Sequence, residues 1–220
     1  MTASRRSFLV GGLALPALAS AAAEPVLSYK VLGRTGLKVT SVGFGCMVTS
    51  DGSVVERAAD LGITYFDTAR NYGGGNNERM VGAALKKKRK DLVLSTKTEA
   101  RNKEDALKQL DTSLKELGTD FVDIWYLHSR STPADITDEL IEAQQIAKAA
   151  GKIRFAGVST HSGHRELIPF LARHPKIDVI LTQYNFTMEP FMNHPLPSSK
   201  DRKSHPARGS PRQTRQTRDD

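Results

Sequence analysis

Residues 92–128, LVLSTKTEARNKEDALKQLDTSLKELGTDFVDIWYLH, contain one complete strand–helix–strand unit of this 220-residue chain. The apolar runs 92–97 and 121–128 predict two buried strands. Between them, Asn102 can cap a helix whose leucines recur at spacings of three and four, and Gly118 is placed to end it. Because a helix connects the two strands, we expect them to lie parallel in one sheet.

The same alternation continues on both sides of this unit. Further strands are predicted at residues 39–47, 63–68, 153–159 and 177–183, further helices at 53–61, 77–88, 138–150 and 165–173, and a hairpin at 27–38. Six nearly continuous apolar strands separated by helices predict an α/β fold with a parallel sheet covered on both faces. A doubly wound sheet and a (β/α)8 TIM barrel both have this pattern.

The barrel is the preferred prediction for two reasons. Polar residues stand at the carboxyl end of nearly every strand, which is where barrel enzymes build their sites. The dinucleotide fingerprint of a doubly wound sheet is missing, because GFGCMV at 43–48 lacks the third glycine. Only about six β/α units are present, whereas a closed barrel needs eight, so we expect an incomplete barrel.

Four of the polar strand-end residues form a candidate proton-transfer site. Asp67 ends one apolar run and Tyr72 follows it by five residues, while Lys97 and His128 end the next two runs. Parallel strands present their carboxyl ends at a common face, so these side chains are expected to converge. Taken singly, each has a structural explanation: a turn cap, a rim aromatic, a solvated strand end or a core histidine. Their joint occurrence in this order favours a site.

These residue types suit the reduction of a carbonyl group, which needs hydride at carbon and a proton at oxygen. A free tyrosine titrates near about pH 10, and an adjacent ammonium favours the phenolate, which makes the phenol a better acid. Lys97 is the candidate ammonium for Tyr72, and Asp67 would keep it charged and oriented. His128 would hydrogen-bond the substrate oxygen and polarise it.

The sequence resembles the aldo-keto reductase family over about residues 29–193. The matching segments are GLKVTSVGFGC (36–46), GITYFDTARNYG (62–73), Asn77-Glu78, LSTK (94–97), LKQLDTSLKELGTDFVD (107–123), YLH (126–128), GVS (157–159) and QYN (183–185). The resemblance implies a (β/α)8 barrel and an oxidoreductase that reduces an aldehyde or ketone to an alcohol. Hydride would come from NADPH, with NADH not excluded, and Tyr72 would be the general acid.

The resemblance also implies part of a cofactor site. Ser159 and Gln183 match positions that hold the nicotinamide carboxamide. The asparagine that usually follows the serine is replaced here by Thr160, which can still hydrogen-bond but has a shorter reach. The family's stacking aromatic and its loop for the adenosine phosphate have no counterpart in the six predicted strands.

The amino terminus is typical of an export signal. Arg5-Arg6 precedes Ser7-Phe8-Leu9 and an uncharged stretch that runs to Ala23. The paired arginines predict the twin-arginine pathway and a periplasmic location, with residues 1–23 as the cleaved signal. A cytoplasmic protein or an amino-terminal membrane anchor remain the alternatives, although about sixteen apolar residues fall short of the roughly twenty that a spanning helix needs.

The composition changes abruptly after Asn193. From Pro197 onward there is no Val, Ile, Leu, Met or aromatic residue, so this part cannot bury a core. We therefore expect a partial NADP-dependent oxidoreductase barrel at 27–193 and a disordered basic tail at 194–220. A truncated or frameshifted form of a longer reductase would explain the change, and a true basic tail that binds an acidic partner or membrane is the alternative.

The distribution of charge and the cysteine content restrict the classes of partner that the sequence predicts. The net charge is +8, but residues 195–220 contribute +4 and residues 1–24 contribute +1, which leaves +3 for residues 25–194. This argues against a nucleic-acid partner. Cys46 is the single cysteine, so neither a disulfide framework nor a metal site is predicted. The expected partner is a small-molecule carbonyl substrate. No stable membrane span of the protein is expected after the signal is removed.

A catalytically incomplete remnant or a non-catalytic binding protein is the alternative function.

Overall fold

A computed structural model describes residues 27–185, which form a six-stranded parallel sheet and a separate two-stranded hairpin. The predicted signal at 1–23 and the predicted tail at 194–220 lie outside the described residues and stay predictions. Within residues 27–185, no helix combines the length and the apolar character that a membrane crossing requires.

The chain pairs its strands in sequence order, as a βα repeat does. The parallel strands are β3 (Phe44–Gly45), β4 (Tyr65–Asp67), β5 (Val93–Thr98), β6 (Val122–Leu127), β7 (Ile153–Thr160) and β8 (Val179–Thr182). The helices are α1 (Gly52–Asp60), α2 (Asn76–Leu85), α3 (Lys103–Leu117), α4 (Asp138–Ala149) and α5 (His164–Arg173). The predicted α/β fold, an incomplete (β/α)8 barrel, is confirmed for the described residues.

The longest helix shows how local sequence sets these boundaries. The side chain of Asn102 accepts a hydrogen bond from the backbone N–H of Asp105 at 2.9 Å, which caps α3 as predicted. Gly118 ends the helix with a φ of 63°, a left-handed conformation that glycine adopts without strain. Between these ends, Leu110, Leu114 and Leu117 are buried against the sheet and the neighbouring helices.

The predicted strand at 39–47 is wrong in one respect, because the structure divides it. Its first residues belong to the hairpin, in which β1 (Tyr29–Val31) pairs antiparallel with β2 (Lys38–Thr40). The hydroxyl of Thr40 then donates to the carbonyl of Val42 at 2.7 Å, and the backbone N–H of Thr40 donates to the hydroxyl of Thr64 at 2.9 Å. These bonds turn the chain, so the first parallel strand is only β3.

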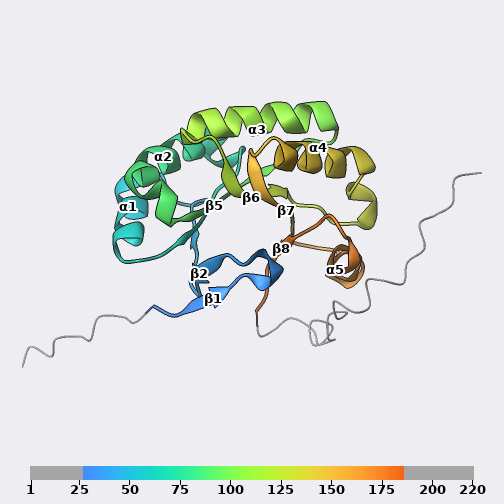
Figure 1. Cartoon of the computed structure of the whole chain (residues 1–220), viewed down its shortest axis with the longest axis horizontal. Coiled ribbons are helices and arrows are strands. Elements are labelled where there is room, and N and C mark those ends of the chain that lie inside the picture. The colour runs from blue at the N-terminus through green and yellow to red at the C-terminus, as the bar shows by residue number, and fades with distance from the viewer. Residues whose placement is uncertain (1–26, 186–220) are drawn as a thin grey trace, which may run out of the picture.

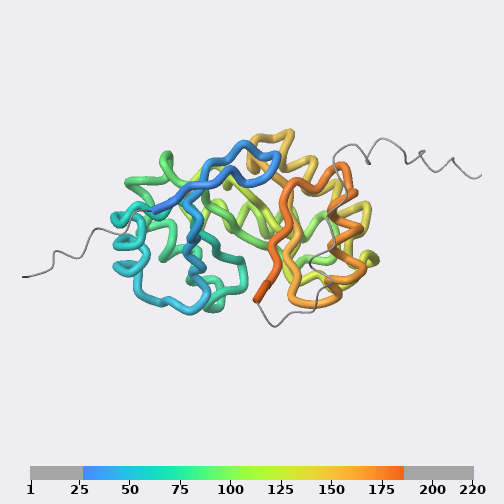
Figure 2. The backbone as a smooth tube through the Cα atoms, turned by 90° about the horizontal axis from the view of Figure 1, so that it is seen from below, coloured from blue at the N-terminus to red at the C-terminus, as the bar shows by residue number. Residues whose placement is uncertain are grey.

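Two apolar layers lie on opposite faces of the sheet. The larger one packs between the strands and helices α1 to α5, which cover the outer face (Figure 1). The smaller one fills the concave face, where Val93, Ile124, Tyr126 and Val179 meet Val39 of the hairpin. Seen from below, the backbone forms an open arc with the hairpin across it (Figure 2). The concave side is therefore a barrel interior that the hairpin covers at one end.

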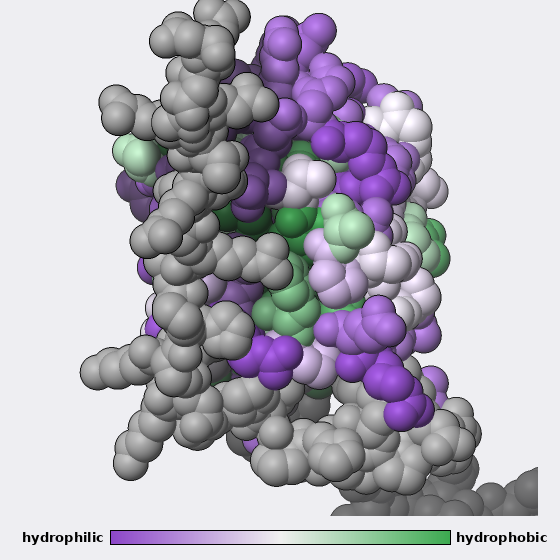
Figure 3. All heavy atoms as spheres, turned by 90° about the vertical axis from the view of Figure 1, so that its right-hand side faces the viewer, coloured by the Kyte–Doolittle hydropathy of each residue, from purple (hydrophilic) through white to green (hydrophobic). Residues whose placement is uncertain are grey.

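The arc does not close within the described residues, because β3 and β8 each have only one neighbouring strand. Three of the four residues of β8 are partly exposed. The side of the molecule that carries α5 shows apolar surface between hydrophilic areas (Figure 3). An unpaired parallel edge of this kind is what six of eight barrel strands would leave.

Candidate active site

The side chain of Lys97 is the centre of the predicted proton-transfer site. It emerges at the end of β5 with only 2 % of its side chain exposed. Its Nζ atom donates to Oδ2 of Asp67 at 2.5 Å, to the carbonyl of Thr68 at 2.7 Å and to the hydroxyl of Tyr72 at 3.2 Å. All three donor positions of the ammonium are therefore used. Two of these hydrogen bonds connect Lys97 to Asp67 and Tyr72, which the sequence predicted to lie close to it.

Tyr72 stands on a short glycine-rich loop after β4. It begins the 3₁₀ helix Tyr72–Gly75, whose three glycines all have positive φ values between 55° and 94°. Such a loop has little side-chain packing of its own, so its position depends on its neighbours. The guanidinium of Arg70 donates to the carbonyl of Gly75 at 2.8 Å and forms an ion pair with Glu78, which is fully buried. This pair fixes the base of the loop.

His128 lies against Tyr72 at the end of β6. Its ring meets the ring of Tyr72 edge-on, with the centroids 5.8 Å apart, and the His128 side chain is 6 % exposed. Burial, and then the positive charge of Lys97, lowers the pKa of His128 to about 4. The imidazole is therefore neutral at pH 7. Its Nδ1 atom has no hydrogen-bond partner among residues 27–185, and the nearest carboxylate oxygen, of Glu99, is 3.8 Å away.

A strained turn follows directly after His128. Ser129 has a φ of 52° and is the one non-glycine residue with positive φ in the described part of the chain. Its N–H donates to the hydroxyl oxygen of Ser159 at 3.0 Å, and the N–H of Arg130 donates to the carbonyl of Ser159 at 2.9 Å. The end of β7 thus holds the turn that follows His128, and backbone strain of this kind is common at functional sites.

The three predicted cofactor residues lie at the ends of β7 and β8. Ser159 is buried beside the Ser129 turn, whereas Gln183 is exposed and donates to the carbonyl of His161 at 3.3 Å. The hydroxyl of Thr160 donates to the carbonyl of Ser162 at 2.5 Å and accepts from the N–H of the same residue. Thr160 is thus hydrogen-bonded within its own loop. Among residues 27–185 no cluster of side chains is suited to a metal ion.

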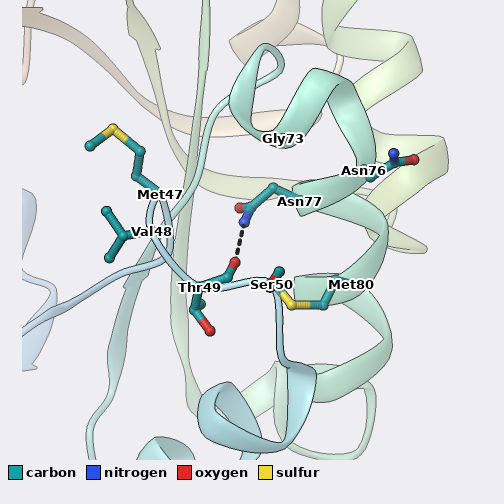
Figure 4. Close-up of a pocket in the computed structure, with 8 residues that line it drawn as sticks. All are labelled: Met47, Val48, Thr49, Ser50, Gly73, Asn76, Asn77 and Met80. Carbon is teal, nitrogen blue, oxygen red and sulfur yellow. Dashed lines mark hydrogen bonds between the residues drawn. The ribbon is translucent and has the colours of Figure 1, made fainter.

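A cavity of about 330 Å³ lies beside the loop that carries Tyr72. It is bounded by the loop after β3 and by the start of α2, and none of the four acid–base side chains lines it (Figure 4). Asn77 joins the two walls, because its amide nitrogen donates to the carbonyls of Cys46 at 2.9 Å and Thr49 at 3.2 Å. The exposed side chains of Met47 and Val48 give this rim an apolar character.

Sequence reasoning missed the hydroxyl groups that support the four acid–base residues Asp67, Tyr72, Lys97 and His128, called the tetrad below. Ser95 donates to Oδ1 of Asp67 at 2.6 Å, and the hydroxyl of Tyr65 lies 3.1 Å from that of Ser95. Both residues stand two positions before a tetrad residue on the same strand, so the two-residue period of a strand could have placed them on the same face. Glu78 belongs to one of the segments that match the family, but the sequence alone indicates no role for it.

The fold and the site define a (β/α)-barrel protein with an acid–base cluster at the carboxyl ends of its strands. A sequence profile of the aldo/keto reductase family matches residues 49–198, and the chain belongs to this family.

Curated relatives and solved structures agree with this assignment. The chain is 36 % identical over 146 residues to an uncharacterized oxidoreductase, YqkF, of Bacillus subtilis and 37 % identical over 155 residues to L-galactose dehydrogenase of Arabidopsis thaliana. These matches cover 59 % and 60 % of this chain and 47 % and 48 % of the relatives. An NADP(+) aldo-keto reductase, yakc, of Schizosaccharomyces pombe is 34 % identical over 57 % of this chain and 44 % of its own.

The holo form of aldo-keto reductase AKR11C1 from Bacillus halodurans superposes with a TM-score of 0.66 at 34 % identity, over 72 % of this chain and 58 % of that one. The thermostable aldo-keto reductase Tm1743, in complex with the inhibitor epalrestat, gives 0.65 at 28 % identity, over 76 % and 66 %. The chain spans about half the length of the curated relatives that it matches.

Proposed function

We propose that this chain reduces an aldehyde or ketone to an alcohol with NAD(P)H, and that Tyr72 is the general acid. The observation that carries the proposal is the position of the Lys97 ammonium, 3.2 Å from the Tyr72 hydroxyl and 2.5 Å from the Asp67 carboxylate. An ammonium in this position stabilises the phenolate that forms when the phenol gives up its proton. Family membership and the NADP(+) relative support the same reaction.

Each residue then has a defined task. The phenol of Tyr72 donates its proton to the carbonyl oxygen, and Lys97 stabilises the resulting phenolate. Asp67 neutralises and orients the buried ammonium, which would otherwise be costly to hold without a partner. A neutral His128 has one N–H, which it can donate to the carbonyl oxygen to place and polarise it. The product oxygen carries the proton from Tyr72, and the product carbon carries the hydride.

Residues at the ends of β7 and β8 suit the nicotinamide end of the cofactor. The oxygen of Ser159 accepts the N–H of Ser129, which leaves the hydroxyl proton of Ser159 available for a carboxamide oxygen. The exposed side-chain amide of Gln183 offers both a donor and an acceptor. These two residues would hold the carboxamide. NADPH, when bound, supplies the hydride.

The test uses the purified protein and two measurements. Titration with NADPH, followed by nicotinamide fluorescence, should give a saturable change, and a small aldehyde should then be reduced. Tyr72→Phe should lower turnover by about a hundredfold or more while NADPH binding is preserved, because only the acidic hydroxyl is lost. Tyr29→Phe, a change at an exposed tyrosine of the hairpin, is the matched control.

The alternative function gives a different result in the same experiment. A non-catalytic remnant or binding protein would show no saturable fluorescence change with NADPH or NADH and no turnover. Equal loss of binding and turnover in Tyr72→Phe would instead assign the tyrosine a structural role.

A further inference from the structure

Three hydroxyl-bearing residues form a layer directly beneath the acid–base tetrad. Tyr65, Ser95 and Tyr126 stand two positions before Asp67, Lys97 and His128 on β4, β5 and β6. Residues two apart on a strand point to the same face, so this layer lies one step deeper in the barrel interior. The strand register adds to this alignment, because Asp67 is paired with Ser95 and Lys97 with Tyr126.

The three hydroxyl groups form a continuous chain of hydrogen bonds that ends on Asp67. Ser95 Oγ lies 2.6 Å from Oδ1 of Asp67, Tyr65 Oη lies 3.1 Å from Ser95 Oγ, and Tyr126 Oη lies 3.1 Å from Tyr65 Oη. Each hydroxyl has one proton. Ser95 gives its proton to the carboxylate, which at 2.6 Å is nearer than its second acceptor, the carbonyl of Phe66 at 3.4 Å. Tyr65 must then donate to Ser95, and Tyr126 must donate to Tyr65. Every proton in the chain therefore points towards Asp67.

The rings of the two phenols pack closely against glycines on neighbouring segments. A Cβ atom on Gly157 would lie 2.4 Å from Cδ1 of Tyr126, and one on Gly43 would lie 2.8 Å from Cδ1 of Tyr65. No other residue type fits against these rings without displacing them. Burial is the main cause that raises the pKa of both phenols, followed by Asp67 for Tyr65 and by Tyr65 for Tyr126. Both phenols therefore stay protonated and able to donate.

We infer that Tyr126, Tyr65 and Ser95 are positioning residues. Their chain of hydrogen bonds, called the hydroxyl relay below, holds the Asp67 carboxylate in the orientation that pairs it with Lys97. The inference rests on the proposed function, in which Lys97 must stay beside Tyr72. Asp67 needs a fixed partner for each of its oxygens. Oδ2 accepts from Lys97, and the relay occupies Oδ1. Hydrogen bonds to a carboxylate are stronger than neutral ones, and successive bonds in a chain strengthen each other.

A double-mutant cycle in turnover tests the relay. Ser95→Ala and Tyr65→Phe should each lower kcat about tenfold, with the KM for NADPH unchanged, because no relay group lies among the residues assigned to the cofactor. The double variant should lose no more than Ser95→Ala alone, since that change already disconnects Tyr65 from Asp67. Tyr29→Phe is the control. Independent losses, about a hundredfold in the double variant, would overturn the relay.

A second readout does not need activity. In protein labelled with ¹⁵N-lysine, the Lys97 ammonium signal is assigned by its absence in Lys97→Met. Its hydrogen exchange should be several-fold faster in Ser95→Ala and Tyr65→Phe than in the wild type, and unchanged exchange in both would overturn the relay. If Ser95→Ala does not fold by circular dichroism, Tyr65→Phe carries the comparison. A wild type without turnover would refute the proposed function, while the exchange rates would still decide the relay.

Discussion

The ammonium of Lys97 lies 3.2 Å from the hydroxyl oxygen of Tyr72 and 4.7 Å from the centroid of the same ring. The cation is thus near the whole phenol and can stabilise the phenolate. Lys97→Met keeps the length of the side chain and removes the charge. We expect kcat with a small aldehyde to fall by about a hundredfold or more, while the NADPH affinity from fluorescence titration changes little.

The control for this prediction is Lys152→Met, a change at a surface lysine that pairs with Asp111. Because exposed ion pairs contribute little, this variant should keep wild-type turnover. Retention of more than half of the wild-type kcat in Lys97→Met would contradict the assigned role of the ammonium.

The depressed pKa of His128 predicts a specific dependence of stability on pH. The pKa is about 4 in the folded protein, against about 6.5 in an unfolded chain. Between these values the unfolded state binds a proton that the folded state does not, so stability rises with pH across this window and is lost as pH falls. Through this difference in pKa, acidification across the window lowers the free energy of unfolding by at most about 3 kcal/mol.

Urea unfolding at several pH values between 4 and 7 measures this effect. The free energy of unfolding should fall more steeply with acidification in the wild type than in His128→Gln, which cannot take up the proton. His174 also has a lowered pKa, mainly through burial, but it is present in both proteins and its contribution cancels. Equal pH slopes for the two proteins would refute the prediction.

The convergence of three tetrad residues could be predicted from sequence because it depends only on strand order and direction, whereas the fourth, Tyr72, is placed by its loop. Asp67, Lys97 and His128 end successive parallel strands, so the fold brings them together whatever their side chains do. The division of the predicted strand 39–47 could not be predicted, because it depends on hydrogen bonds of Thr40 to a residue far along the chain, Thr64.

The relay beneath the tetrad marks a second limit of sequence reasoning. The two-residue period places Tyr65 below Asp67 and Ser95 below Lys97, but it does not give the register between strands. The contact from Ser95 to Asp67 exists because these residues are paired across β4 and β5. The local bond between Thr160 and Ser162 was hidden for a related reason, since a hydroxyl can bond to its own loop in preference to a ligand.

The buried ion pair between Arg70 and Glu78 predicts a large loss of stability when one partner is removed. Glu78 is fully buried and also accepts from the hydroxyl of Thr96 at 2.5 Å. Arg70→Met should lower the free energy of unfolding by about 3 kcal/mol in urea denaturation, because it leaves an uncompensated buried carboxylate. Adding Glu78→Gln to this variant should recover part of the loss. A double variant less stable than Arg70→Met would contradict this account.

The burial of Cys46 predicts that its thiol reacts slowly in the native state. Its side chain is fully buried, and burial, with the nearby charge of Asp67, raises the pKa of its thiol to about 12. Because the thiolate is the reactive form, reaction with a disulfide reagent at pH 8 should be at least about a thousandfold slower than with a free thiol. In urea the same protein should react quickly with one equivalent, since Cys46 is the single cysteine. Fast reaction without denaturant would mean that the loop joining β3 to α1 opens readily in the folded protein.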